Sequence, residues 1–316
     1  MKQYDNIRAH KPEGIENRKA YIIGGGIAGL ACAVFLIDDC YVPGENVTII
    51  DQLPVFGGSM DGVKIGEGKY QSRGERELEP YMECLWYLGN KIPSLYTEGR
   101  TITEETVDAN KTDRICAKAR IIHNQGEVWD GINKFKMSSK LTQKMMKMLT
   151  MPEEEMNGIS IEEFFGDTFD EFKMTPTWQC FHTMLAFKDY HSMIEMKRYM
   201  IRFIQFQPRM EKLDGILHTK YNEFDSLIDP ILHWLKEKGV CFIPGATVTD
   251  LVMDESCSVV MKIIGISGSE SLSIDVLETD MVISTLASMT QNSTYGDNTN
   301  PVTINTSTEK GFFSVW

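Results

Sequence analysis

The chain has 316 residues, 42% of them hydrophobic, and a formal net charge of −13 at pH 7. This length and composition predict a soluble globular protein of two domains with a sizeable core. The negative charge disfavours nucleic acid as a partner and gives no general attraction to anionic lipid. The seven cysteines show no C-x-x-C spacing and the six histidines no H-x-x-x-H spacing, so we expect reduced thiols, a cytoplasmic location and no structural metal.

A dinucleotide-binding pattern follows a polar arm at residues 1–18. Residues 21–23 predict a buried strand, GGGIAG at 24–29 supplies the spacing G-x-G-x-x-G, residues 30–37 predict a buried helix, and residues 47–50 predict a second strand ending at Asp51. The first glycine permits a tight turn, the second lets the backbone approach a pyrophosphate, and the third lets the helix pack closely on the sheet. An acid at the end of the second strand receives ribose hydroxyls. The residues predicted to bind the dinucleotide are Gly24, Gly26, Ile27, Ala28, Gly29, Asp51 and Gln52.

Two segments of this region have alternative interpretations. The uncharged run at 20–37 is long enough to suggest a membrane span or a signal peptide. Four glycines within it and a leader of mixed charge argue against both. The loop after Asp51 holds Gly57, Gly58 and Ser59, which we expect to form a second tight turn beside the cofactor, since ligands lie at the carboxyl ends of strands in doubly wound sheets. An ordinary loop after a strand is the alternative.

Residues 70–88 concentrate charged side chains before an apolar, helix-like run that starts at residue 81. The charges are Arg73, Glu75, Arg76, Glu77 and Glu79. On composition alone this pattern is typical of a charged helix start.

The middle of the chain predicts mainly helices. Residues 90–130 are mixed and loop-rich, with a strand pair near 119–122 and 127–129. We expect helices at 138–151, after Ser160, and as one long tract over 177–206. Helical spacing in that tract puts Met193, Met196 and Met200 on one face with Tyr199 beside it, and core packing explains most of that face.

The last part predicts a return to the dinucleotide sheet. A helix at 221–236 leads into a strand at 240–243, a β-meander follows at 247–253, 259–266 and 272–277, and a final strand lies at 280–284. The fold class is therefore α/β, with a Rossmann-like domain, a β-meander and a mainly helical insertion. The predicted domains are 1–137, the first part of the dinucleotide-binding domain, 138–237, the helical substrate-capping domain, and 238–316, the return to the first domain.

With these elements in order the chain resembles the oleate hydratase family, also called myosin-cross-reactive antigens. The matching stretches are KPEGIENRKAYIIGGGIAGLACAVFLI, FGGSMDG, SRGERELEPYMECLWYL, MLAFKDYHSMIEMKRYMIRF, KYNEFDSL and NSTYGDN. The resemblance implies a glutathione-reductase-like FAD-binding fold and a lyase that adds water to a cis double bond of an unsaturated free fatty acid, with no net redox change. It also implies a homodimer and peripheral membrane contact through a C-terminal part.

The resemblance also implies roles for individual residues. The glycine turn and Asp51 would hold the adenosine diphosphate part of FAD, with Gly57, Gly58 and Ser59 along it. Arg73 and Gly74 would lie beside the isoalloxazine. Glu77 matches the catalytic glutamate, assigned here to the water, and Tyr199 the catalytic tyrosine, assigned to the proton. Glu223 and His191 are candidate substrate contacts.

The sequence departs from the family pattern in three places. Glu75 and Leu78 replace a glycine and a methionine of the usual loop R-G-G-R-E-M, and Glu223 stands at the position of a substrate-binding glutamine. The chain is shorter than the usual members and ends in FFSVW, so we expect a C-terminally truncated member. Two alternatives therefore stay open: a flavin oxidoreductase on an apolar substrate, such as a desaturase or amine-oxidase-like enzyme, and an inactive FAD- or fatty-acid-binding fragment.

Overall fold

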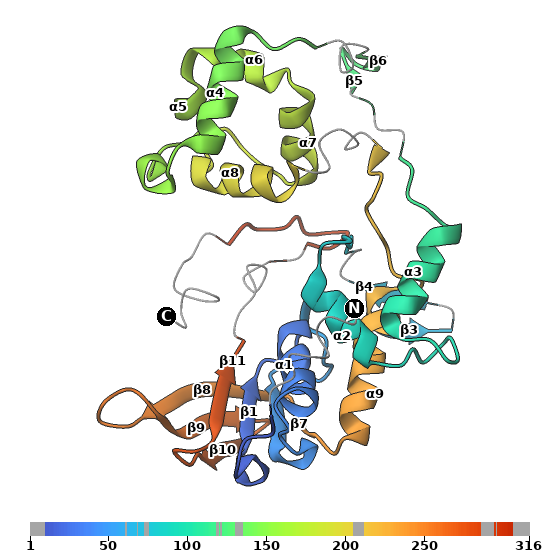
Figure 1. Cartoon of the computed structure of the whole chain (residues 1–316), viewed down its shortest axis with the longest axis vertical. Coiled ribbons are helices and arrows are strands. Elements are labelled where there is room, and N and C mark those ends of the chain that lie inside the picture. Colours follow the sequence, from blue (N-terminus) through green and yellow to red (C-terminus); the bar gives the residue numbers. More distant parts are fainter. Residues whose placement is uncertain are drawn as a thin grey trace. The chain divides into compact units, whose positions relative to one another are not determined.

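The computed structural model describes residues 10–60, 62–67, 69–72, 76–117, 120, 122–129, 135–204, 212–285, 294 and 296–305. These residues form two compact units (Figure 1). The sheet unit comprises Met1–Thr112 and His218–Trp316, and the helical unit comprises Asp113–Leu217. The helical unit thus begins 25 residues and ends 20 residues earlier than the predicted segment 138–237. Its end differs because the last helix of that segment packs in the core of the sheet unit.

A four-stranded parallel sheet is the centre of the sheet unit. Its strand order is β11 (Met281–Ser284), β1 (Ala20–Ile23), β2 (Val47–Asp51) and β7 (Cys241–Pro244). The register pairs Ile22 with Ile283 on one side and with Ile49 on the other. All four residues of β1 are buried, as expected for a strand covered on both faces. The predicted strands and the return of the chain to the dinucleotide sheet are confirmed.

Helices cover one face of this sheet and a second sheet covers the other. Leu30 and Val34 of α1 (Ile27–Asp38) pack with Ile231 and Leu235 of α9 (Asp229–Glu237) in one apolar cluster. Side chains alternate across β1, so that Ile22 joins this cluster while its neighbours face an antiparallel sheet on the other side. That sheet has the order β10 (Glu270–Asp275), β9 (Val260–Ser267) and β8 (Ala246–Met253), which confirms the predicted meander.

Three features of the sheet unit differ from the predictions. The helix expected over 221–236 starts as a π-helix, Phe224–Ile228, before α9. A β-hairpin of β3 (Gly62–Gly66) and β4 (Lys69–Ser72) follows the second glycine turn. Helix α2 (Glu83–Lys91) is followed by an unpredicted helix, α3 (Ile102–Thr112), in the region expected to be loop-rich. The buried face of α3 is largely polar, so it shows no apolar periodicity.

The helical unit packs its helices around one aromatic and methionine core. They are α4 (Ser139–Thr150), α5 (Ile161–Phe165), α6 (Phe169–Lys173), α7 (Pro176–Met184) and α8 (Met193–Arg202). The hydroxyls of Ser138, Ser160 and Thr175 cap α4, α5 and α7. A short pair, β5 (Ile122–His123) and β6 (Glu127–Val128), confirms the predicted strand pair over a shorter range.

The single long helix predicted over 177–206 is wrong. The chain leaves α7 at Leu185, and Ala186 takes a positive φ of 56° before α8 begins at Met193. The predicted face of α8 is confirmed, since Met193, Met196 and Met200 are all buried in the core.

Short 3₁₀ helices lie at Ile15–Asn17, Gly44–Asn46, Gly58–Met60, Glu153–Met156 and Gly166–Thr168. Among the residues that the structure describes, every helix is too short or too polar to cross a bilayer.

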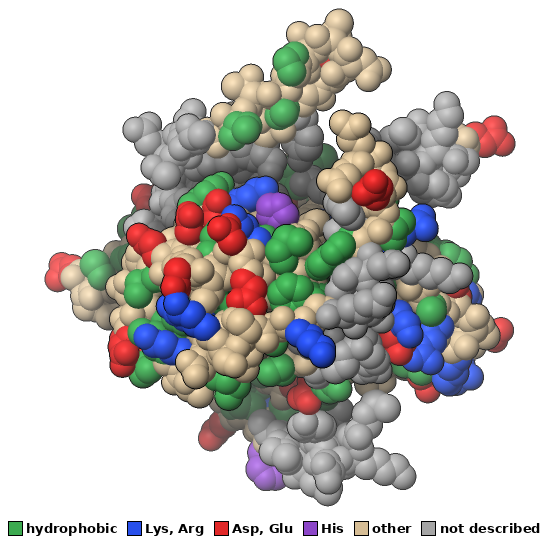
Figure 2. All heavy atoms as spheres, turned by 90° about the horizontal axis from the view of Figure 1, so that it is seen from above, with side chains coloured by type: hydrophobic (Ala, Val, Ile, Leu, Met, Phe, Trp, Pro, Cys, Tyr) green, Lys and Arg blue, Asp and Glu red, His purple; other side chains and the backbone are tan. Residues whose placement is uncertain are grey.

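Acidic and basic side chains are interspersed on the face shown in Figure 2. Several such groups pair across the surface of the helical unit, for example Lys173 with Asp170 at 2.7 Å and Arg198 with Glu153 at 2.5 Å. Exposed pairs of this kind contribute little to stability.

Candidate functional site

The first glycine turn joins β1 to α1. Gly24 has a φ of +106° and donates its N–H to the Ile50 carbonyl at 2.8 Å. A Cβ at Gly29 would lie 1.9 Å from the Gly24 carbonyl oxygen, so only glycine lets α1 start this close to the strand. At Gly26, by contrast, the nearest atom to an added Cβ is the Gly58 Cα, at 3.7 Å. Gly26 therefore leaves space at the N-terminus of α1, where the N–H groups of the first helical turn have no partner within the helix.

Asp51 ties this turn to the end of β2. Its two carboxylate oxygens accept hydrogen bonds from the N–H of Gly25 at 2.5 Å and from the N–H of Leu53 at 2.7 Å. A carboxylate oxygen can accept more than one hydrogen bond, so these two bonds leave Asp51 able to accept a ribose hydroxyl as well. The contact of Asp51 with a ribose stays a prediction. Gln52 beside it is exposed.

A second glycine turn lies against the first. Gly57 donates its N–H to the Gly25 carbonyl at 2.9 Å, and a Cβ on Gly58 would lie 3.0 Å from the Gly26 Cα. Gly57 and Gly58 have φ values of +125° and +58°, so this approach depends on glycine at both positions. The two turns together leave a surface of backbone at the carboxyl ends of β1 and β2, where a doubly wound sheet binds its ligand.

Two further side chains that the sequence analysis missed close the first turn. The ring of Phe56 occupies the place where a Cβ of Gly25 would be, with Cδ1 2.2 Å from that position. The Thr285 hydroxyl, just after β11, donates to the carbonyls of Ile23 and Gly24 at 3.1 and 3.2 Å. No sequence signal marks either residue, because each acts by its place in the folded sheet.

Arg76 brings three of the predicted site segments together. Its backbone N–H donates to Oε1 of Glu223 at 2.5 Å, and its guanidinium donates to the Ser59 carbonyl at 3.2 Å. Glu223 is only 6% exposed, whereas Glu77, next to Arg76, is exposed. Arg76 was not among the predicted site residues, although it lies beside Glu77 in the stretch SRGERELEP. Arg73, Gly74 and Glu75 lie outside the described residues.

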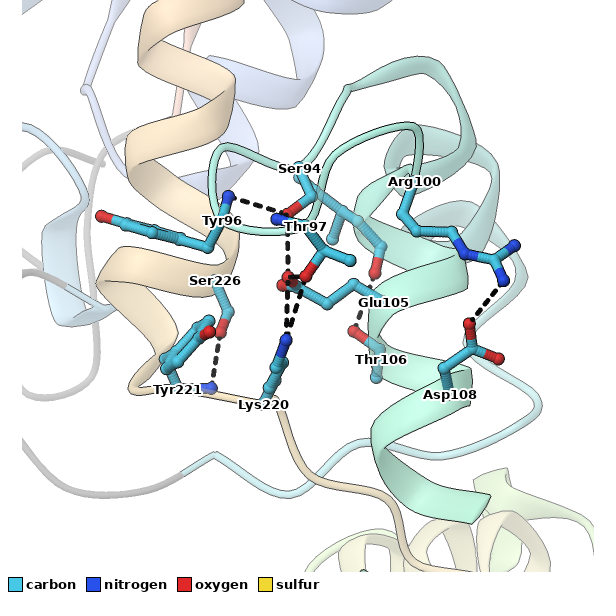
Figure 3. A network of polar contacts seen from close by, with 11 residues as sticks. Ser94, Tyr96, Thr97, Arg100, Glu105, Thr106, Asp108, Lys220, Tyr221 and Ser226 are labelled. Atoms are coloured by element: carbon cyan, nitrogen blue, oxygen red, sulfur yellow. Dashed lines mark hydrogen bonds and ion pairs between the residues drawn. The ribbon is translucent and has the colours of Figure 1, made fainter. Parts of the chain in front are cut away.

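The segment that leads to Glu223 is held by a polar network around Glu105 of α3 (Figure 3). Glu105 is 3% exposed and accepts hydrogen bonds from the hydroxyls of Ser94, at 2.8 Å, and Thr97. Lys220 donates to the Thr97 hydroxyl at 3.0 Å. The ring of Tyr221 then packs edge-on against Tyr96, with ring centroids 5.2 Å apart. Beside the network, a cavity of about 220 Å³ is lined by Thr97, Glu105, Asp108, Ala109, Thr112 and Lys220.

The helical unit holds the other two predicted site residues around one aromatic ring. Phe187, 3% exposed, packs edge-on against Tyr199 with centroids 5.2 Å apart and against His191 at 6.0 Å. His191 Nδ1 accepts the Lys188 N–H at 3.3 Å. Tyr199 is half-buried on α8 and Glu77 belongs to the sheet unit, so their pairing as acid and base stays a prediction.

A parallel sheet whose glycine turns meet at its carboxyl edge places the chain in the class of Rossmann-like α/β folds. Two solved structures share the fold. An oxidoreductase from Methanosarcina mazei has a TM-score of 0.53 at 14% identity and covers 85% of this chain and 59% of its own. A CLA-producing fatty acid isomerase from P. acnes has a TM-score of 0.51 at 14% identity and covers 86% and 59%.

Within this class the chain belongs to the MCRA family, whose model matches residues 17–316. It is 35% identical over 288 residues to an oleate hydratase of Streptococcus pyogenes serotype M49 (strain NZ131), a match that covers 90% of this chain and 48% of that protein. It is 29% identical over 313 residues to a linoleate hydratase of Lactiplantibacillus plantarum, covering 90% and 53%. The chain therefore spans about half the length of the curated relatives it matches. The family resemblance is confirmed.

Proposed function

We propose that this protein is a hydro-lyase that adds water to a cis double bond of an unsaturated free fatty acid, in the manner of oleate to 10-hydroxystearate. The observation that carries the proposal is the membership in the MCRA family together with two relatives that are both fatty-acid hydratases. A cytoplasmic homodimer with peripheral membrane contact is part of the same proposal.

FAD is the proposed cofactor, and the residues present fit it. Gly26 leaves space at the start of α1, and Gly57 and Gly58 keep the second turn free of side chains. A pyrophosphate there would meet the N–H groups of the first helical turn, at Ile27, Ala28 and Gly29. Asp51 and Gln52 would face the adenosine ribose, and Ser59, Arg73 and Gly74 would lie along the rest of the molecule. When bound, FAD shapes and polarises the site.

The reaction needs a proton donor and a base in a site that excludes bulk water. We propose that the Tyr199 hydroxyl gives its proton to one alkene carbon, while water bonds to the other carbon and loses a proton to the Glu77 carboxylate. The π bond breaks as one C–H and one C–O bond form, with no net change of oxidation state, and the proton taken up by Glu77 returns through water to the Tyr199 oxygen. The half-buried position of Tyr199 beside the buried Phe187 supports the role of a proton donor shielded from bulk water. The substrate contacts of Glu223 and His191 stay predictions.

Product analysis in heavy-oxygen water tests this function. The purified protein, reconstituted with FAD, is incubated with oleate and with linoleate, and Glu77→Gln and Tyr199→Phe serve as matched variants. We expect hydroxy fatty acid that carries one heavy oxygen from the parent protein and a loss of at least about a hundredfold in each variant. Product without label would contradict hydration, and bleaching of the flavin absorbance on substrate addition would select the oxidoreductase alternative.

A further inference from the structure

Glu77 lies in a short segment that is fixed on both sides. On one side, Arg76 is held through its backbone N–H by Glu223 and through its guanidinium by the Ser59 carbonyl. On the other side, Leu78 is buried, and the Glu79 carbonyl accepts hydrogen bonds from the Met82 N–H at 3.1 Å and the Trp86 indole at 2.9 Å. The exposed Glu77 side chain therefore projects from a backbone with few conformations available to it.

Glu223, which accepts the hydrogen bond from the Arg76 N–H, comes from a distant part of the sequence. It is 147 residues from Arg76 in the sequence and stands at the N-terminus of the π-helix Phe224–Ile228. A carboxylate that accepts a backbone N–H makes a charge-assisted hydrogen bond, which is stronger than a neutral one. A π-helix is rare and often marks a functional segment.

The Glu223 backbone is itself held in place. The carbonyl of Asn222 accepts the Ser226 N–H at 2.9 Å, and its side chain accepts the Asp225 N–H at 3.0 Å. A Cβ at Gly62 would lie 2.8 Å from the Phe224 Cβ, so the start of the π-helix packs directly on the strand that follows the second glycine turn. The Glu105 network holds Lys220 and Tyr221 just before it.

We propose that Glu223 is a positioning residue that sets the place of the Glu77 carboxylate by accepting the Arg76 N–H. The inference rests on the proposed function in one respect, which is that the Glu77 carboxylate takes a proton from the water. Hydrogen-bond acceptance is all that the role requires, and a glutamine carbonyl oxygen would also supply it. A direct contact with the fatty-acid carboxylate would depend instead on the charge of residue 223.

Glu223→Gln and Glu223→Met separate these roles, because both keep the volume and only Gln keeps an acceptor. The first readout is hydrogen exchange of the Arg76 amide in the FAD-reconstituted protein, followed by NMR with ¹⁵N-arginine. We expect exchange at least tenfold faster in the Met variant and within threefold of the parent in the Gln variant. The control Glu171→Ala removes a carboxylate that accepts a backbone N–H in the helical unit, from Ser138 at 2.6 Å, and should leave the Arg76 amide unchanged.

The second readout is hydration of oleate. We expect the Met variant to lose at least tenfold in kcat with KM changed less than threefold, and the Gln variant to keep both. Unchanged exchange in a folded Met variant overturns the proposal, and so does a Gln variant that changes KM tenfold at constant kcat. If the Met variant does not fold, the exchange rate of the Arg76 amide in the parent decides the matter. The proposal is then overturned if this amide exchanges as fast as an amide without a hydrogen bond. Absence of hydration in the parent refutes the proposed function, while the exchange result still decides the Arg76 anchor.

Discussion

At the scale of single residues, the glycines of the first turn serve two separate purposes. Gly29 is required by the fold, because a Cβ there would meet the backbone of Gly24 at 1.9 Å. Gly26 has an extended backbone that any residue adopts, with φ −73° and ψ −180°, and space around it. The fold alone would accept alanine at Gly26, so glycine at that position is consistent with the proposed approach of a pyrophosphate.

The two purposes can be separated by substitution. We expect Gly29→Ala to lower the free energy of unfolding by about 2 kcal/mol, because the extra methyl group overpacks the turn. Gly26→Ala should change it by less than about 1 kcal/mol. The same Gly26→Ala should weaken FAD binding about tenfold or more, equal to about 1.4 kcal/mol. Denaturant unfolding and a flavin fluorescence titration measure the two quantities. Equal FAD affinity in the parent and Gly26→Ala would contradict the placement of the pyrophosphate.

At the scale of elements, the sequence predicts the strands and helices that show an apolar pattern. It does not reveal a helix whose buried face is polar, or a turn that contains no glycine. The four strands of the parallel sheet are short apolar runs and were predictable. Helix α3 buries Thr103, Glu105 and Thr106, so apolar spacing could not reveal it. The break between α7 and α8 falls at Ala186, where neither glycine nor proline marks the change of direction.

In the candidate site, too, local sequence patterns predict some features, while others depend on contacts between distant parts of the chain. The two glycine turns follow from local spacing, whereas their direct contact, from the Gly57 N–H to the Gly25 carbonyl, appears only in the structure. The hydrogen bond from Arg76 to Glu223 joins positions 147 residues apart, and no periodicity or motif connects them. The roles of Glu77 and Tyr199 came from the family resemblance, since neither residue differs by composition or spacing from an ordinary helix surface.

The turn between β8 and β9 allows a prediction of pH dependence. Hydrogen bonds from the Ser256 hydroxyl and from the N–H groups of Val259 and Ser258 lower the pKa of Asp254 from 3.8 to about 2. Because the folded state favours the carboxylate, the stabilisation by Asp254 is fully present above pH 3.8 and is lost as the pH falls through about 2. An NMR titration of the carboxyl carbon should show this pKa, and Ser256→Ala should raise it. A parent pKa at 3.8 would contradict the geometry.

At the scale of the whole molecule, each unit has its own core. Among the residues that the structure describes, the cluster of the helical unit runs from Leu141 to Phe203. The core of the sheet unit, by contrast, combines Leu30 and Ile49 with Ile231 and Leu235 from a distant part of the chain. One unit is thus continuous in sequence, whereas the other is assembled from two segments.

This difference predicts how fragments of the chain behave. We expect residues 113–217, expressed alone, to be helical and to unfold in one cooperative transition, because the buried hydrophobic cluster of their described residues lies within this range. Residues 10–112, expressed alone as the control, should show no cooperative transition, since they lack β7, β11 and α9. Circular dichroism during thermal unfolding checks both. A helical fragment that melts without cooperativity would show that its core is incomplete.

The parallel sheet has a consequence for the synthesis of the protein. Strands β1 and β2 leave the ribosome early, but their outer partners β7 and β11 lie beyond the whole helical unit. During translation the first two strands therefore present unpaired edges and an apolar helix, and such surfaces are prone to aggregation. The helical unit can fold while the chain is still growing, whereas the first glycine turn is completed only after Thr285 has emerged. Chaperone dependence of the nascent chain should accordingly be greatest before β11 is made.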